Sequence, residues 1–254
     1  MIARTRDVAD ALDAELRIAD FTDSSHNGLQ VSNSGAVSRI CCGVDASLDF
    51  FRAAKDKGAD LCLVHHGISW GDSLAKISGS NYEIVSFLIN NDIALYAAHL
   101  PIDAHPVLGN NAQIAAALGL VDVAGFCNYH GNLIGRKGRL PEAIPFSQLH
   151  ARVRAITPDG THHALQFGSE MVQTVGIVSG GAAGEVSQAA AERLDCFITG
   201  EMNLEGYNTA KHESVNVISA GHYATERFGV KAVGEFLQRN FKLPFEFIDL
   251  KLPW

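Results

Sequence analysis

The chain has 254 residues, of which 47% are hydrophobic and 19% charged, so a disordered or fibrous protein is excluded and one large or two small globular domains are expected. The formal net charge of −8 disfavours non-specific binding to nucleic acid, which depends on an excess of Lys and Arg. No apolar run reaches the roughly 18 residues of a membrane span and the N-terminus carries no secretory signal, so we expect a cytoplasmic protein.

The predicted elements alternate strongly between helix and strand. A helix is expected over residues 5–18, where Val8, Leu12 and Leu16 share one stripe, and a polar, turn-rich stretch follows over residues 20–28. Apolar segments then predict three strands, over residues 39–45, 59–64 and 93–98. Helices are predicted between them, over residues 46–57, with Gly58 as C-cap, and over residues 82–90.

The same order of elements recurs in the second half of the chain. Strands are predicted over residues 173–179, 195–199 and 215–220, and helices over residues 184–194 and 204–211. We therefore predict an α/β fold of two related three-layer lobes, produced by an internal β-α-β-α-β duplication. The predicted lobes span residues 1–125 and 126–254. Residues 121–171, with a predicted helix over 146–155, belong to the second lobe or join the two.

No functional site is predicted at the five cysteines, at one pair of histidines or at one group of basic residues. The cysteines form no CxxC pair and four lie in apolar strand-like segments, so we expect buried thiols in a reducing compartment rather than a zinc–thiolate site. His162 and His163 have no predicted strand beside them and are expected at the surface. The basic residues Arg136, Lys137 and Arg139 would suit an anionic substrate, but a solvated loop is the favoured interpretation.

Polar residues follow the predicted strands at four places. His65-His66 follows the second strand, His99 and Asp103 follow the third, and their repeat-mates are Gly200-Glu201 and the pair His222 and Glu226. Taken singly, each motif also fits a hydrogen-bonded loop or a helix cap. Sites in open α/β sheets form at the carboxyl ends of the strands, and facing lobes would bring these side chains to one cleft.

Four histidines and two carboxylates are more ligands than one tetrahedral zinc ion needs, so this group indicates a two-metal site. The metals that accept such a mixed nitrogen and oxygen set include Zn, Fe, Mn and Ni. The sequence has no GxGxxG turn, no P-loop and no GxSxG elbow, and it identifies no cofactor-binding or catalytic residue beyond the metal ligands.

Six motifs in order carry a resemblance to a known family. They are HNGLQV (26–31), VHHG (64–67) with Trp70, HLPIDAH (99–105), LGNN (108–111), ITGE (198–201) and GHYATE (221–226). With these motifs the chain resembles the GTP cyclohydrolase I type 2 homologues, also called the NGG-interacting-factor-three-like family of dinuclear metal proteins. The resemblance covers nearly the whole chain and is greatest to the short bacterial members, which lack an inserted domain.

The resemblance implies a toroidal homohexamer of two-lobed chains, with metal sites that face an internal cavity. It implies two divalent metal ions per chain, held in the cleft between the lobes by five ligands: His65, His66, Asp103, His222 and Glu226. His99 would then lie near the metals without being a primary ligand. Asn208 stands about where some relatives carry a histidine.

Two functions follow from this resemblance and from the donor set. The first is a metal-dependent hydrolase that acts on a nucleotide-like or other small substrate, because paired cations activate water and polarise carbonyl or phosphoryl oxygens. The alternative is a non-enzymatic scaffold that stores or delivers metal or regulates other proteins. A nucleic-acid binder is disfavoured by the acidic balance, and residues for recognising GTP are not identified.

Overall fold

The computed structural model describes residues 1–252 and divides into two compact units. Unit 1 comprises Met1–Ile102 and Val230–Leu250, and unit 2 comprises Asp103–Gly229 together with Lys251 and Leu252. The boundary therefore differs from the one at residue 125 that the repeat suggested. The reason is packing: residues 114–118 belong to the core of unit 2, and a strand near the C-terminus pairs within the sheet of unit 1.

Unit 1 contains a five-stranded sheet in the order β13-β4-β5-β6-β2, in which β4, β5 and β6 are parallel. Strands β1 and β3 form a separate two-stranded sheet. The elements are β1 (Ala3–Arg4), α1 (Thr5–Glu15), η1 (Ile18–Asp20), β2 (Gly28–Val31), β3 (Ala36–Val37), β4 (Ile40–Asp45), α2 (Leu48–Asp56), β5 (Leu61–His66), α3 (Ser80–Asn90), β6 (Ala94–Ala97) and β13 (Phe245–Phe247). Helix α4 (Leu100–Ala104) begins in unit 1 and ends in unit 2.

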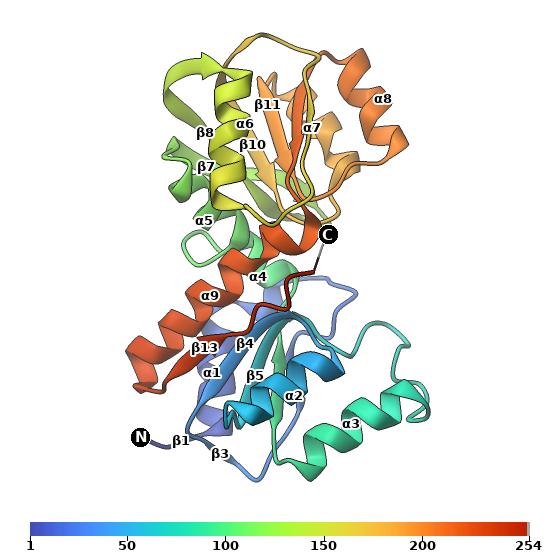
Figure 1. Cartoon of the computed structure of the whole chain (residues 1–254), viewed down its shortest axis with the longest axis vertical. Coiled ribbons are helices and arrows are strands. Elements are labelled where there is room, and N and C mark those ends of the chain that lie inside the picture. Colours follow the sequence, from blue (N-terminus) through green and yellow to red (C-terminus); the bar gives the residue numbers. More distant parts are fainter. Residues whose placement is uncertain (253–254) are drawn as a thin grey trace. The chain divides into compact units, whose positions relative to one another are not determined.

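The sheet of unit 1 is covered on both faces. Successive residues of its strands point to opposite faces, so each strand contributes side chains to both layers. Helices α2 and α3 lie on one side of this sheet (Figure 1). Cys41 of β4 belongs to the core that these helices complete through residues such as Phe50 and Leu88. The next residue, Cys42, faces the opposite side, where Gly234 of helix α9 (His222–Phe241) comes close to its sulfur. Unit 1 is therefore the three-layer lobe that its apolar strands predicted.

Unit 2 contains a six-stranded sheet in the order β7-β8-β10-β11-β12-β9, in which β10, β11 and β12 are parallel. Its elements are α5 (Asn110–Ala117), β7 (Val121–Tyr129), β8 (Asn132–Pro145), α6 (Phe146–Ile156), β9 (His163–Leu165), β10 (Met171–Val178), η2 (Ala183–Glu185), α7 (Val186–Ala191), β11 (Cys196–Thr199), α8 (Leu204–His212), β12 (Asn216–Ser219) and the first eight residues of α9. Helices α5 and α6 pack on the face that includes Val175 and Ile177, whereas α7 and α8 lie on the other side of the sheet (Figure 1).

The internal duplication is confirmed by the strand order. In unit 1 the chain runs β4-α2-β5-α3-β6, and in unit 2 it runs β10-α7-β11-α8-β12. In both units an antiparallel strand that precedes the repeat, β2 or β9, pairs with the third strand. The predicted end of α2 is confirmed, since Gly58 takes a left-handed φ of 73° after the helix. At the start of α2 the Ser47 hydroxyl accepts a bond from the Phe50 amide, a cap that was not predicted.

Three local predictions are corrected. His65 and His66 are the last residues of β5 rather than the start of a loop. The basic residues Arg136, Lys137 and Arg139 lie in strand β8 and not in a solvated loop: Arg136 is buried and Lys137 pairs with Glu192. His163 begins β9, a strand too short for periodicity to reveal it, although its predicted position at the surface is confirmed.

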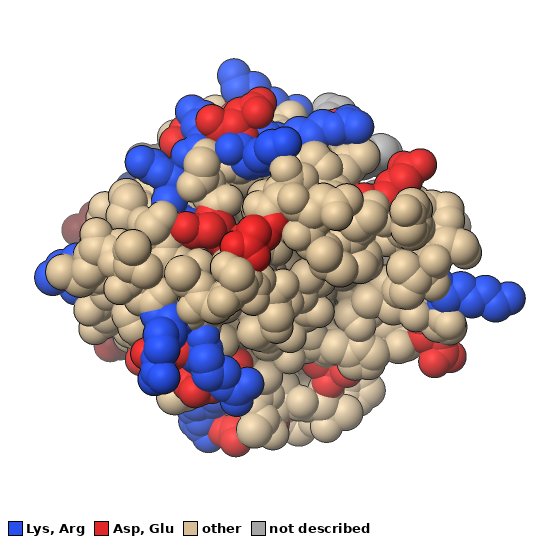
Figure 2. All heavy atoms as spheres, turned by 90° about the horizontal axis from the view of Figure 1, so that it is seen from below, with Lys and Arg blue, Asp and Glu red and all other residues tan. Residues whose placement is uncertain are grey.

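Charged side chains on the surface alternate in sign. On the face in Figure 2, Lys and Arg lie in small groups beside Asp and Glu, with uncharged surface between them. The helices of unit 1 carry short-range ion pairs, such as Arg6 with Asp10 and Arg52 with Asp49. Among the residues described, no helix combines the length and hydropathy needed to cross a membrane.

Candidate functional site

In unit 1, three histidines form a cluster that fits a metal ion. His65 and His66 end β5, and His99 follows β6, the neighbouring parallel strand. One ring nitrogen of each histidine lies within 4.8 Å of those of the other two. Since parallel strands end at the same edge of the sheet, the local fold alone brings these three side chains together.

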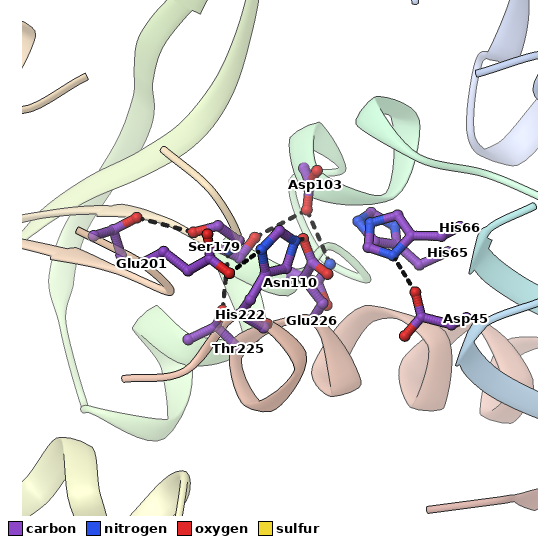
Figure 3. A network of polar contacts seen from close by, with 12 residues as sticks. Asp45, His65, His66, Asp103, Asn110, Ser179, Glu201, His222, Thr225 and Glu226 are labelled. Carbon is purple, nitrogen blue, oxygen red and sulfur yellow. Dashed lines mark hydrogen bonds and ion pairs between the residues drawn. The ribbon is translucent and has the colours of Figure 1, made fainter. Parts of the chain in front are cut away.

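Each imidazole of this cluster is held by an oxygen acceptor at Nδ1. His65 Nδ1 lies 3.0 Å from the Ala98 carbonyl oxygen. His66 Nδ1 lies 2.8 Å from Asp45 Oδ1, as Figure 3 shows. The register of β4 and β5 places Asp45 directly beside His66. Because a carbonyl or carboxylate oxygen only accepts, Nδ1 donates its proton in both cases, and Nε2 carries the lone pair that a metal ion requires.

Asp23 holds the third imidazole, and its own environment is unusual. This carboxylate is 2% exposed and accepts from His99 Nδ1 at 3.0 Å, Asn27 Nδ2 at 2.9 Å and the backbone amides of Ser25 and Leu100. Burial raises the pKa of Asp23, but the hydrogen bond and charge of His99, together with the other donors, outweigh burial and lower that pKa to about 2. Asp23 is therefore an ionised anchor for His99.

In unit 2, Asp103 is fixed by two side-chain donors. Asn110 Nδ2 donates to Asp103 Oδ1 at 2.9 Å, and the Ser179 hydroxyl donates to the same oxygen at 2.9 Å (Figure 3). All three side chains are buried. Asn110 begins α5 and Ser179 follows β10, so the orientation of this carboxylate depends on elements far apart in the sequence.

His222 and Glu226 lie one turn apart at the start of α9. His222 Nε2 is 3.2 Å from Glu226 Oε1, and His222 Nδ1 is 2.9 Å from Glu201 Oε1. Burial by itself lowers the pKa of His222, but the hydrogen bonds to and charges of Glu226 and Glu201 outweigh it and raise the pKa to about 9. The same two carboxylates favour a cation at this place.

Gly180 provides the room that Glu226 occupies. Its φ of 69° is one that residues with a Cβ rarely adopt, and a Cβ there would collide with Glu226 Oε1. Its amide donates to the Thr225 hydroxyl at 3.0 Å. Gly180, which lies just after β10, thus lets a carboxylate approach the backbone, a role that the sequence did not reveal.

The five predicted ligands thus fall into two groups, His65 and His66 in unit 1 and Asp103, His222 and Glu226 in unit 2. The structure places His99 in the first group, as the strand-end pattern indicated. Asn208 lies exposed on α8. Burial raises the pKa of all five thiols, which disfavours thiolate ligation by Cys41, Cys42, Cys62, Cys127 and Cys196.

Sequence reasoning missed the carboxylates that orient the histidines. Asp45 could have been found, because it is the last residue of a predicted strand and its neighbouring strand ends in the histidine pair. Glu201 follows the predicted strand over residues 195–199, but the sequence gives it no role. Asp23 lies in a polar stretch with no periodic signal, and only the folded chain brings it to His99.

Comparison with known proteins identifies consistent relatives. A family model described as Duf34/NIF3 (NGG1p interacting factor 3) matches residues 3–253. Curated relatives named GTP cyclohydrolase 1 type 2 homolog include one from Deinococcus radiodurans, 42% identical over 236 residues that cover 92% of this chain and 88% of the relative. Another, from Vibrio cholerae, is 38% identical over 232 residues that cover 91% of this chain and 92% of the relative.

Solved structures agree with this assignment. The protein ybgI superposes with a TM-score of 0.93 at 35% identity, over 99% of this chain and 100% of that chain. A protein from Thermus thermophilus superposes with a TM-score of 0.86 at 37% identity, over 97% of this chain and 98% of that chain.

Proposed function

The chain belongs to the Duf34/NIF3 family, and on that premise we propose that it binds two divalent metal ions per chain and is a metal-dependent hydrolase of a nucleotide-like or other small substrate. The proposed ligands are His65, His66, Asp103, His222 and Glu226. The chemistry of this donor set fits the proposal, because imidazole nitrogens and carboxylate oxygens together suit Zn, Fe, Mn and Ni.

One observation carries the proposal, and it recurs in both units. Four imidazoles each have Nδ1 beside an oxygen acceptor: Ala98 O for His65, Asp45 for His66, Asp23 for His99 and Glu201 for His222. This arrangement fixes the tautomer and presents Nε2, as it does around metal-binding histidines generally. Four histidines held in this way at strand ends are hard to explain by loop structure alone.

We extend the proposed ligand set to His99. It lies with His65 and His66 in one cluster, and a buried, ionised carboxylate holds its Nδ1. Burying a carboxylate is costly in free energy unless strong hydrogen bonds compensate it. A buried carboxylate that holds this ring therefore indicates that the orientation of His99 matters, which a histidine that only filled space would not require.

The residues of each unit have distinct roles in this proposal. The imidazoles and the carboxylates of Asp103 and Glu226 bind the ions, and Asp23, Asp45 and Glu201 orient the imidazoles. The bound pair of cations would supply a Lewis acid for a carbonyl or phosphoryl oxygen and lower the pKa of water. Asn110 and Ser179 keep one oxygen of Asp103 in a fixed direction.

Metal content and activity test the proposal separately. We expect the purified protein to contain divalent metal by elemental analysis, and His65→Ala and Glu226→Ala to lose it. His212→Ala, which changes an exposed histidine at the end of α8, is the matched control and should keep the metal. Full metal occupancy in both ligand variants would refute the ligand assignment.

The hydrolase part is tested with the metal restored. GTP belongs in the substrate panel because the curated relatives carry the name GTP cyclohydrolase 1 type 2 homolog. A saturable activity that Asp103→Asn abolishes would support an enzyme. Reversible metal exchange with no turnover over a broad panel would instead support the non-enzymatic scaffold.

A further inference from the structure

Unit 2 contains a pocket of about 290 Å³ at the carboxyl ends of β11 and β12. Its side chains come from Thr161, His163, Glu201, Met202, Ser219 and His222. His222 is thus shared between the pocket and the proposed metal ligands. Glu201 orients His222 in that proposal, and Thr161, His163, Met202 and Ser219 have been given no role in it.

A serine with a buried hydroxyl belongs to the lining of this pocket. Ser219 is the last residue of β12 and is 1% exposed, and its Oγ has no hydrogen-bond partner among the residues that the structure describes. A buried hydroxyl without a partner costs free energy that a ligand can recover by bonding to it. Ser219 therefore points to a ligand that brings a polar atom to the base of the pocket.

One wall of the pocket is built by a turn that packs tightly. The backbone of His163 pairs with that of Ser219 across β9 and β12. At Gly160, just before Thr161, a Cβ would collide with the Ala220 carbonyl oxygen, so only glycine allows this turn to lie so near the end of β12. The positions of Thr161 and His163 beside the pocket follow from this close approach.

The lining of the pocket favours a ligand that donates hydrogen bonds and disfavours an anionic ligand. None of its described residues is Lys or Arg, the side chains that usually bind phosphate or carboxylate. Glu201 brings a carboxylate, whose Oε1 already accepts from His222, so its other oxygen remains available to accept N–H or O–H groups. Met202 adds a thioether, which packs well against a flat ring.

We propose that this pocket binds the base of a nucleoside, with base N–H groups donating to Glu201, a hydrogen bond to the Ser219 hydroxyl and the ring against Met202. This inference rests on the proposed function, since it names the part of a nucleotide-like substrate that unit 2 would recognise. A base held here lies next to His222, whose Nδ1 faces Glu201 and whose Nε2 faces Glu226.

The methionines offer a direct measurement. The chain has three, and only Met202 lines the pocket, so a protein labelled with ¹³C at the methionine methyls gives one reporter signal, with Met1 and Met171 as internal references. The probes are guanosine, adenosine, cytidine and uridine, with ribose and inorganic phosphate as comparators. We expect the Met202 signal to shift with the nucleosides, and most tightly with those that carry an exocyclic amino group.

Two serine variants make the test specific. Ser219→Ala removes the pocket hydroxyl and should weaken nucleoside binding about three- to tenfold, the range expected for one neutral hydrogen bond. Ser25→Ala removes a hydroxyl of unit 1 that is likewise buried and without a partner among the described residues, and it should leave binding unchanged.

The outcomes separate this inference from the metal proposal. No Met202 shift with any nucleoside, an equal shift with ribose or phosphate, or unchanged affinity in Ser219→Ala would overturn the pocket assignment. Metal content is measured on the same sample. Nucleoside binding by a protein without metal would support the pocket assignment and refute the metal centre. Metal in a protein that binds no nucleoside would support the metal centre and refute the pocket assignment.

Discussion

Asp23 offers the sharpest test of how the histidine cluster is held. Asp23→Asn keeps the shape of the side chain but replaces one carboxylate oxygen by an amide NH₂. Both oxygens of Asp23 accept hydrogen bonds, Oδ1 from the Ser25 amide and Oδ2 from Asn27 and the Leu100 amide, and both lie near His99 Nδ1. In either orientation the new NH₂ group faces donors, so the variant loses a charge and leaves buried donors unsatisfied.

The magnitude follows from the pKa of Asp23. In the folded state it is lowered from 3.8 to about 2, and each unit corresponds to about 1.4 kcal/mol, so ionised Asp23 contributes about 2 kcal/mol at pH 7. Because the folded-state pKa is below the unfolded one, this contribution is fully present above pH 4 and is lost as the pH falls towards 2. Near pH 3 about half of it should remain.

Urea unfolding of the wild type and the variant from pH 7 to pH 3 measures this contribution. The Trp70 ring is 4.9 Å from the His99 ring, so its fluorescence reports on this part of unit 1, in a background where Trp254→Phe removes the second tryptophan. Asp49→Asn is the control, since Asp49 forms an exposed ion pair with Arg52, and the change should alter the free energy of unfolding by less than about 0.5 kcal/mol. A loss in Asp23→Asn no larger than this, or one that stays constant down to pH 3, would refute the reasoning.

Three further outcomes are expected. Gly180→Ala should lower the free energy of unfolding by about 2 kcal/mol and reduce metal content, because residue 180 has a left-handed φ and its new Cβ would collide with Glu226. Gly184→Ala is the control, since Gly184 has open space around it, and its free energy of unfolding should stay near that of the wild type. Equal denaturation midpoints for the two variants would contradict this prediction. Glu201→Gln should lower the pKa of His222 from about 9 in the metal-free protein, measured by NMR titration of the ring, because one of two neighbouring charges is removed; an unchanged titration would show that Glu201 does not act on this ring. Light scattering should give the mass of six chains of 27.2 kDa, and a monomeric mass would refute the proposed homohexamer.

The repeated strands and helices could be predicted from the sequence because their signals are local. Short apolar segments such as residues 61–64 and 196–199 predict buried parallel strands, and the polar residues that follow them lie at one edge of each sheet. The placement of His65, His66 and His99 in one cluster follows from strand order alone, and so does the equivalent position of His222 after the third strand of the second repeat.

Only the tertiary structure decided what surrounds these residues. Asp23 reaches His99 from a stretch without periodic pattern, and β13 joins the sheet of unit 1 from near the C-terminus. The buried Ser219 hydroxyl in the pocket lining likewise has no signal in the sequence. The physical reason is the same in each case: hydrophobic periodicity records which face of an element is buried, whereas a hydrogen-bond partner or a pocket wall depends on contacts between segments far apart in the chain.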